Sequence, residues 1–141
     1  MSEVSIEGRK VFVTGGSTGL GRASAIALAE RGAQVSLCGL PEEGLREMEA
    51  MRLPDGSSFR CFGGDLTEPA FLDRMAAGAE RTDILLNCAG RAIAAPFLDN
   101  DPADWERIFS LNVLSTFRMT QAAARGMVAR GSGHIITISS A

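Results

Sequence analysis

The stretch KVFVTGGSTGLG, residues 10–21, decides the fold that this sequence adopts. Its first five residues, 10–14, are mostly apolar and β-branched, which is typical of a strand. Residues 22–31 have the composition of a helix that ends at Gly32. A glycine turn between a strand and a helix lets backbone N–H groups approach a phosphate without an intervening Cβ, and the helix N-terminus adds partial positive charge. The stretch therefore predicts a strand–turn–helix unit that binds a phosphate group.

The spacing of the glycines narrows the kind of site. Gly15, Gly19 and Gly21 form the pattern Gly-x-x-x-Gly-x-Gly, so the commoner dinucleotide pattern Gly-x-Gly-x-x-Gly is not matched. No Gly-Lys-Ser/Thr sequence follows, which excludes the P-loop pattern. Turns also collect glycine for steric reasons alone, so a purely structural turn is an alternative. The strand–turn–helix context favours phosphate binding over that alternative.

Outward from this unit, short apolar runs alternate with longer helix-like segments. Asp101 is a plausible N-cap for the longest helix, with Pro102 at its first position and Gly131 after its end. The alternation predicts an α/β fold with a parallel sheet and helices on both faces. Ile135, Ile136 and Ile138 would supply apolar groups to both faces of the last strand, as an interior parallel strand requires. The further strands are expected at 35–38, 59–62, 83–87 and 134–139, and the further helices at 41–51, 68–79 and 102–130.

Bulk composition excludes several classes of protein. The 141 residues, 45% hydrophobic and 22% charged, are typical of one soluble globular domain, which we assign to residues 1–141. A net charge of −3 argues against a nucleic-acid partner, which normally leaves a basic footprint. No apolar run is long enough to span a membrane and the N-terminus lacks signal-peptide features, so a cytoplasmic protein is expected. Cys38, Cys61 and Cys88 lack metal-type spacing and adjoin apolar runs, which predicts buried reduced thiols and no metal site.

Five segments in the same order resemble the short-chain dehydrogenase/reductase family. The turn Thr14-Gly15-x-x-x-Gly19-x-Gly21 resembles the coenzyme signature of that family. Four further matches follow, with Cys88 in place of the second asparagine of the family's Asn-Asn-Ala-Gly element. Together the five matches cover nearly the whole chain, from Arg9 to Ala141. Their shared order points to this family more specifically than any one match does. The four are Gly64-Asp65-Leu66-Thr67, Asn87-Cys88-Ala89-Gly90, Leu111-Asn112-Val113 and Ile138-Ser139-Ser140.

The resemblance implies a Rossmann-type doubly wound sheet with strand order 3-2-1-4-5, incomplete on its C-terminal side. It also implies an NAD or NADP cofactor, with Asp65 and Leu66 beside the adenine and the segment 87–90 on the nicotinamide side. Asn112 would belong to a water-mediated proton path. Ser140, or Ser139 in its place, would polarise the substrate oxygen. The implied cofactor-binding residues are Gly15, Ser17, Thr18, Gly19, Leu20, Gly21, Gly39, Leu40, Asp65, Leu66, Asn87, Ala89 and Gly90.

Several of these residues also have a structural interpretation. Asp65 could be a turn-former beside two glycines, and Asn87 could satisfy loop backbone groups. Asn112 lies at the edge of an apolar stripe, where it is either a surface amide or a buried one that needs a partner. The sequence alone leaves these alternatives open.

The choice between NAD and NADP is also left open. An acidic side chain at the end of the second strand would favour NAD, and a basic one would favour NADP. The sequence has Gly39-Leu40-Pro41 there, which is neither, and Thr18 in the glycine turn is uncharged. We therefore predict an NAD(P) site without a preference.

The family's proton donor, a tyrosine in a Tyr-x-x-x-Lys motif, has no counterpart in this chain. The sequence contains no tyrosine, and its only lysine is Lys10 in the first strand. We therefore expect the chain to be part of a longer protein and to be inactive alone, because a positioned group must exchange the alcohol proton. The resemblance implies a homo-oligomeric full-length enzyme that acts on a small-molecule alcohol or carbonyl. One alternative is a non-catalytic dinucleotide-binding sensor or scaffold. Another is a Rossmann methyltransferase, which the adenine and serine matches disfavour.

Overall fold

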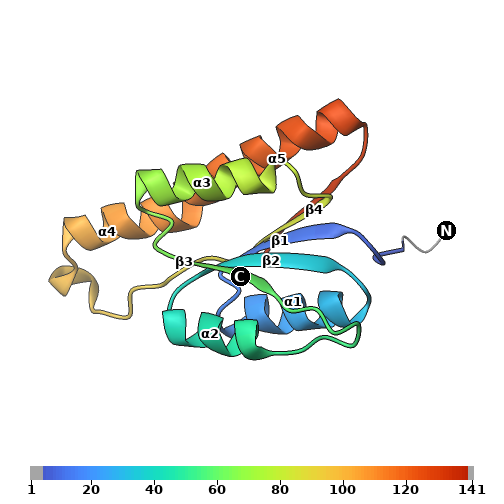
Figure 1. Ribbon diagram of the computed structural model, residues 1–141. Helices are drawn as coiled ribbons and strands as arrows, with labels where there is room; N and C mark the ends of the chain where they lie inside the picture. The colour runs from blue at the N-terminus through green and yellow to red at the C-terminus, as the bar shows by residue number, and fades with distance from the viewer. Residues whose placement is uncertain (1–4, 140–141) are drawn as a thin grey trace.

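The computed structural model describes residues 5–139 as one parallel sheet between two layers of helices (Figure 1). The sheet has the order β3-β2-β1-β4-β5, and every neighbouring pair is parallel. Helices α1 and α2 cover one face, and α3 and α5 cover the other (Figure 1). The predicted doubly wound α/β fold and its strand order are therefore confirmed. The elements are β1 (Lys10–Thr14), α1 (Gly19–Glu30), β2 (Gln34–Gly39), α2 (Glu42–Ala50), β3 (Arg60–Gly63), α3 (Pro69–Ala79), β4 (Ile84–Asn87), η1 (Phe97–Asp99), α4 (Pro102–Phe109), η2 (Ser110–Ser115), α5 (Thr116–Arg130) and β5 (His134–Thr137).

The central strand β1 shows how the sequence builds two cores. Successive side chains of a strand point to opposite faces of the sheet. Val11 and Val13 accordingly belong to the hydrophobic cluster formed with α1 and α2, whereas Phe12 belongs to the cluster formed with α3 and α5. All three side chains are buried, as expected for a parallel strand covered on both faces. β1 is thereby held rigidly beneath the glycine turn that follows it.

The predicted helix signals are present, although some boundaries move. The Asp101 side chain accepts a hydrogen bond from the Ala103 N–H (2.8 Å) at the start of α4, as expected of an N-cap. Gly32 (φ 86°) and Gly131 (φ 72°) adopt the left-handed conformation that ends α1 and α5. Helix α1 begins at Gly19, inside the glycine turn, and not at residue 22 as predicted. Its first N–H groups therefore lie in the turn itself.

The predicted helix over 102–130 has the expected bounds, but it is not α-helical throughout. Between α4 and α5 it contains the π-helical turn η2, which carries Asn112 and was not predicted. Within this turn the Ser115 hydroxyl donates to the carbonyl of Leu111 (2.5 Å) and so competes with the backbone for that acceptor. A π turn inserts one extra residue per turn without changing the apolar character of the segment, so hydrophobic periodicity does not reveal it.

Strand β5 is shorter than the sequence predicted, and its apolar side chains are partly exposed. It ends at Thr137, two residues before the expected end, and pairs with β4. Ile135 is 37% exposed and Ile136 48% exposed, because β5 is an edge of the described sheet. No helix in the described part of the chain is long and apolar enough to cross a membrane.

Candidate functional site: a cavity at the carboxyl edge of the sheet

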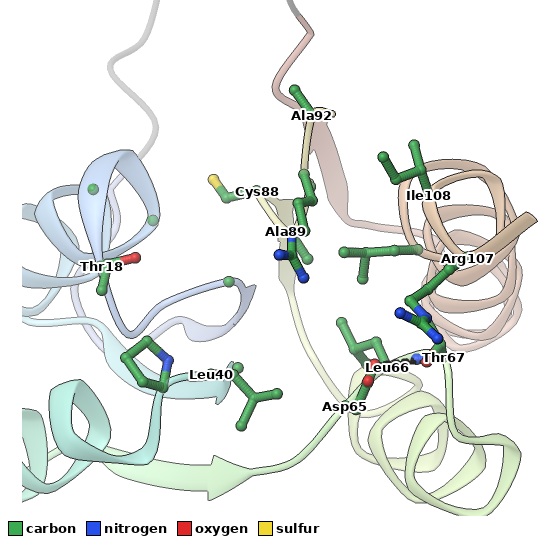
Figure 2. Close-up of a pocket in the computed structure, with 18 of the residues that line it drawn as sticks. Thr18, Leu40, Asp65, Leu66, Thr67, Cys88, Ala89, Ala92, Arg107 and Ile108 are labelled. Atoms are coloured by element: carbon green, nitrogen blue, oxygen red, sulfur yellow. Dashed lines mark hydrogen bonds between the residues drawn. The ribbon is translucent and has the colours of Figure 1, made fainter. Parts of the chain in front are cut away.

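A cavity of about 830 Å³ lies at the carboxyl ends of the strands. β1 is paired with β2 on one side and with β4 on the other, so the chain turns away in opposite directions from this point. In open α/β sheets such a switch point is where ligands bind. Five segments line the cavity (Figure 2). They are the glycine turn, the end of β2, residues 64–67 after β3, residues 88–94 after β4, and the α4–η2 segment.

All but two of the predicted cofactor-binding residues lie together in the wall of this cavity. The two that do not are Ser17 and Asn87, which are buried behind the wall, 1% and 2% exposed. The fold thus brings together residues that are up to 75 positions apart in the sequence, from Gly15 to Gly90. The predicted residues that line the cavity are Gly15, Thr18, Gly19, Leu20, Gly21, Gly39, Leu40, Asp65, Leu66, Ala89 and Gly90.

Of the three glycines in the Gly-x-x-x-Gly-x-Gly pattern, two are required by packing and the third faces open space. A Cβ on Gly15 would lie 2.8 Å from the backbone N and Cα of Ala89 in the segment after β4. A Cβ on Gly21 would collide with the carbonyl of Gly15. Gly19 (φ 54°) differs, because a Cβ there would have no protein atom within 4 Å. The turn therefore leaves room at Gly19 for a ligand, and its tight packing elsewhere fits a backbone cradle for phosphate.

Two hydroxyl groups fasten the glycine turn to the neighbouring walls. Thr14 Oγ1 accepts hydrogen bonds from the N–H groups of Cys88 and Ala89, each 3.2 Å long. Ser17 Oγ donates to the carbonyl of Leu40 at the end of β2 (2.5 Å). Ser17 was predicted to contact the cofactor, but the structure places it where it supports the turn from behind. The role of Thr14 was missed, although it precedes the first glycine of the motif.

Asp65 lines the cavity and also organises its own loop. Its Oδ1 accepts two hydrogen bonds from Thr67, one from the backbone N–H and one from the hydroxyl, each 2.8 Å long. Leu66 is anchored in the core cluster with α3 and α5 and is 3% exposed. The turn-forming interpretation of Asp65 is therefore confirmed, and it does not exclude contact with a ligand from the cavity wall.

Asn87 stabilises the sheet beneath the cavity. Its Nδ2 donates to Thr120 Oγ1 (3.0 Å) on α5 and to Thr137 Oγ1 (3.3 Å) on β5. Within the described residues its buried Oδ1 has no hydrogen-bond partner. The alternative that Asn87 satisfies loop backbone groups is thus replaced by a link between β4, α5 and β5.

Asn112 holds the loop that follows β4. Its Oδ1 accepts from the Arg91 N–H (2.9 Å), and its Nδ2 donates to the Arg91 carbonyl (2.8 Å). Asn112 is exposed, as in the surface-amide alternative, yet its amide pairs with a backbone 21 positions earlier in the chain, which no local pattern could identify. Asn112 lies beside the cavity wall, and its participation in catalysis stays a prediction. Ser140 lies outside the described residues, and Ser139 is exposed after β5.

Three charged residues in the cavity wall were not predicted. They are Arg91 after β4, and Asp104 and Arg107 on α4. Arg107 Nη1 lies 3.9 Å from Asp104 Oδ1, and the arginine extends beside Leu66 and Thr67 in Figure 2. The spacing of Asp104 and Arg107 indicates an ion pair on a helix, but only the fold shows that the pair borders a cavity.

The cysteines are less uniformly buried than predicted. Only Cys38 is buried, and burial raises the pKa of its thiol to about 12 despite a hydrogen bond with the Gly15 backbone. Cys61 and Cys88 are partly buried, and burial raises the pKa of both thiols. Cys88 also lines the cavity. All three thiols are therefore protonated near neutral pH.

Comparison with known proteins agrees with this arrangement. A family model described as short chain dehydrogenase matches residues 9–141. The chain is 36% identical to 2-dehydro-3-deoxy-D-gluconate 5-dehydrogenase of Escherichia coli (strain K12), with 99% of this chain and 56% of the relative covered. It is also 36% identical to dehydrogenase/reductase SDR family member 6 of Rattus norvegicus, with 96% and 53% covered. The chain thus spans about half the length of these curated relatives.

Solved structures with bound nucleotide are also similar to the chain. A metagenomic short-chain oxidoreductase in complex with NADP is 32% identical, with a TM-score of 0.87 and 97% of this chain and 64% of that chain covered. A short-chain dehydrogenase from Sphingobium yanoikuyae in complex with NADPH is 32% identical, with a TM-score of 0.86 and 94% and 54% covered. The family model, the relatives and the cavity agree on one conclusion: the chain belongs to the short-chain dehydrogenase/reductase family.

Proposed function

We propose that this chain is the nucleotide-binding part of an NAD(P)-dependent oxidoreductase that interconverts an alcohol and a carbonyl. The observation that carries the proposal is the glycine turn at the β1–β4 switch point. Gly15 and Gly21 have no room for a side chain there, while Gly19 opens onto the cavity. Such a turn at a helix N-terminus suits a diphosphate. The relatives named as dehydrogenases support the choice of reaction class.

In this proposal the cofactor lies along the cavity, from the residues after β3 at its adenine end to the residues after β4 at its nicotinamide end. The N–H groups around Gly19 would hold the diphosphate, because they lie at the start of α1. Asp65 and Leu66 would border the adenine, and Ala89 and Gly90 the nicotinamide. The bound nicotinamide would supply the hydride acceptor or donor, and the protein would supply binding and orientation.

The residues around the nicotinamide end would orient the substrate and its proton. Ser140 would polarise the substrate oxygen, and Asn112 would take part in a water-mediated proton path. The proposed substrate is a small-molecule alcohol or carbonyl compound, and the proposed full-length protein is a homo-oligomer. The cofactor is NAD or NADP, since Gly39 and Leu40 carry neither charge that would discriminate between them.

Binding of reduced nucleotides to the chain tests the proposal. Titration with NADH and NADPH, followed by calorimetry and by quenching of the single tryptophan Trp105, should give saturable binding of at least one of them. Gly19→Val should remove that binding, because its side chain would project into the open space of the turn. Circular dichroism would show whether the variant is folded. A folded chain that binds neither nucleotide would refute the proposal. Turnover is then measured on the full-length protein with a panel of alcohols and ketones.

A further inference from the structure

The charged side chains in the cavity wall differ in whether they form an ion pair. Arg107 lies within 4 Å of an acidic partner, Asp104, whereas Asp65 uses its Oδ1 to bind Thr67. Arg91 also lines the cavity, and it takes part in no ion pair within residues 5–139. Arg91 is therefore the cavity cation that forms no ion pair with a carboxylate of the described residues.

The glycine turn itself provides no full positive charge. Residues 15–21 are uncharged, and the first cation of α1, Arg22, is paired with Glu47 at 2.6 Å. The helix N-terminus contributes roughly half an elementary charge. The diphosphate of a dinucleotide carries two negative charges, so a cation on the opposite wall would complete the neutralisation.

Arg91 is attached at a suitable place for this role. Two residues before it, Ala89 is so close to the turn that a Cβ on Gly15 would lie 2.8 Å from its backbone. The backbone of Arg91 is held on both sides by the amide of Asn112, with hydrogen bonds of 2.9 and 2.8 Å. A side chain on a fixed backbone loses less freedom when it binds a ligand. Arg107 lies instead beside Leu66 and Thr67, away from the turn (Figure 2).

We propose that the Arg91 guanidinium binds the diphosphate of the nucleotide opposite the glycine turn, and that Asn112 is the residue that positions it. The inference rests on the proposed function, because it assigns a further group to the same nucleotide site. Arginine suits the task, since its planar guanidinium donates two parallel hydrogen bonds to phosphate oxygens.

The test compares Arg91→Leu with the unsubstituted chain. Leucine keeps apolar bulk and removes the charge. We expect the Kd of NADH to rise about tenfold to a hundredfold, as for loss of a charge-assisted hydrogen bond. The Kd of adenosine, which lacks phosphate, should stay unchanged. The increase of the NADH Kd with salt concentration should become shallower, because one charge contact is lost. Arg91→Lys, which keeps the charge, should recover part of the affinity.

Two further variants separate this role from general effects. Arg118→Leu makes the same change in net charge on α5, where Arg118 pairs with Asp73 at 3.1 Å, and should leave the NADH Kd unchanged. Asn112→Ala as a single substitution should weaken NADH binding. Combined with Arg91→Leu, it should raise the Kd of NADH little further than Arg91→Leu alone. Equal losses for NADH and adenosine in Arg91→Leu would overturn the inference, as would unchanged NADH binding. In either case binding of NADH or NADPH by the unsubstituted chain would leave the proposed function standing, whereas a folded unsubstituted chain that binds neither nucleotide would refute the proposed function.

Discussion

The two walls of the nucleotide cavity are built in different ways. The β1–α1 wall consists of residues 15–21, which are close in sequence and shape the wall through backbone packing. The facing wall joins the loop after β4 to the π-helical turn η2 through the side chain of Asn112, which reaches a backbone 21 positions away. The first wall is shaped mainly by steric exclusion, with the Ser17 hydroxyl fastening it to Leu40, and the second is held by hydrogen bonds. Substitutions that overpack the first wall should therefore abolish nucleotide binding, whereas substitutions in the second wall should weaken it only partly.

The largest effect is expected from Gly21→Ala in the first wall. Its Cβ would collide with the Gly15 carbonyl, and overpacking of this kind typically costs about 1–3 kcal/mol of unfolding free energy, with nucleotide binding lost as the turn distorts. Gly19→Ala is the matched control, since its Cβ meets no protein atom. It should lower stability only by the left-handed strain, about 1–2 kcal/mol, while still weakening nucleotide binding. Urea unfolding and NADH titration measure both variants. Normal NADH affinity in Gly21→Ala would contradict a wall fixed by steric exclusion.

A smaller and graded effect is expected from Asn112→Ala in the second wall. The variant loses two side-chain hydrogen bonds to the Arg91 backbone, worth about 0.5–1.5 kcal/mol each. Amide hydrogen exchange should accelerate at Arg91, and the Kd of NADH should rise several-fold. Asn100→Ala removes a similar bond, from Nδ2 to the Pro96 carbonyl (2.9 Å), outside the cavity and should leave the Kd unchanged. If exchange at Arg91 stayed slow in Asn112→Ala, the hydrogen bonds would not be what holds this wall.

Cofactor choice at the end of β2 should change by about tenfold when charge is introduced at Leu40. This side chain is 51% exposed and lines the cavity, so it offers room for substitution. Leu40→Arg should favour NADPH over NADH, and Leu40→Asp should do the reverse by repelling the 2′-phosphate. Gly39 is less suitable, because a Cβ there would lie 3.3 Å from Ser17 Oγ and 3.4 Å from Gly15 Cα. The measurement is the ratio of the Kd of NADPH to the Kd of NADH. An unaltered ratio in both variants would show that Leu40 does not lie near the 2′-phosphate of the bound cofactor.

The smallest effect concerns the thiol in the second wall. Burial raises the pKa of Cys88 and of Cys61, so both thiols are protonated near neutral pH and should alkylate more slowly than a free cysteine. Their reaction with iodoacetamide should accelerate as the pH rises above 9, when the thiolate fraction grows. NADH should slow alkylation of Cys88 a few-fold, because Cys88 lines the cavity, and should leave Cys61 unaffected. Peptide mass spectrometry measures both rates. Equal protection of the two would argue against a nucleotide beside Cys88.

Much of the first wall could be predicted from the sequence because its determinants are local. The strand, the turn glycines and the helix follow one another between Lys10 and Glu30, and the spacing of the glycines indicates what the turn can approach. The positions of Asp65, Leu66, Ala89 and Gly90 were predicted through the family resemblance, and the fold brings them to the same cavity. The choice of ligand-contacting residues stays a prediction, with Ser17 and Asn87 placed behind the wall.

The second wall could not be predicted in the same way. The helix signals at Asp101 and Gly131 are correct, yet nothing between them marks the π-helical turn that carries Asn112. The sequence raised the question of a partner for that amide without indicating Arg91. It likewise gave no sign that Arg107 reaches the cavity, because a charged residue on a helix is ordinarily solvated.

The strand order followed from the family resemblance. The sequence by itself determined the alternation of strands and helices, the parallel character of the sheet and the glycine turn between β1 and α1. These features depend on hydrophobic periodicity, helix caps and the absence of a Cβ, all of which act over a few residues. The tertiary structure alone decided that Arg91 stands in the cavity on a backbone clamped by Asn112, and that Ser17 and Asn87 support the wall from behind. Such contacts join residues 21 or more positions apart, and their geometry exists only once the strands have paired and the helices have packed against them.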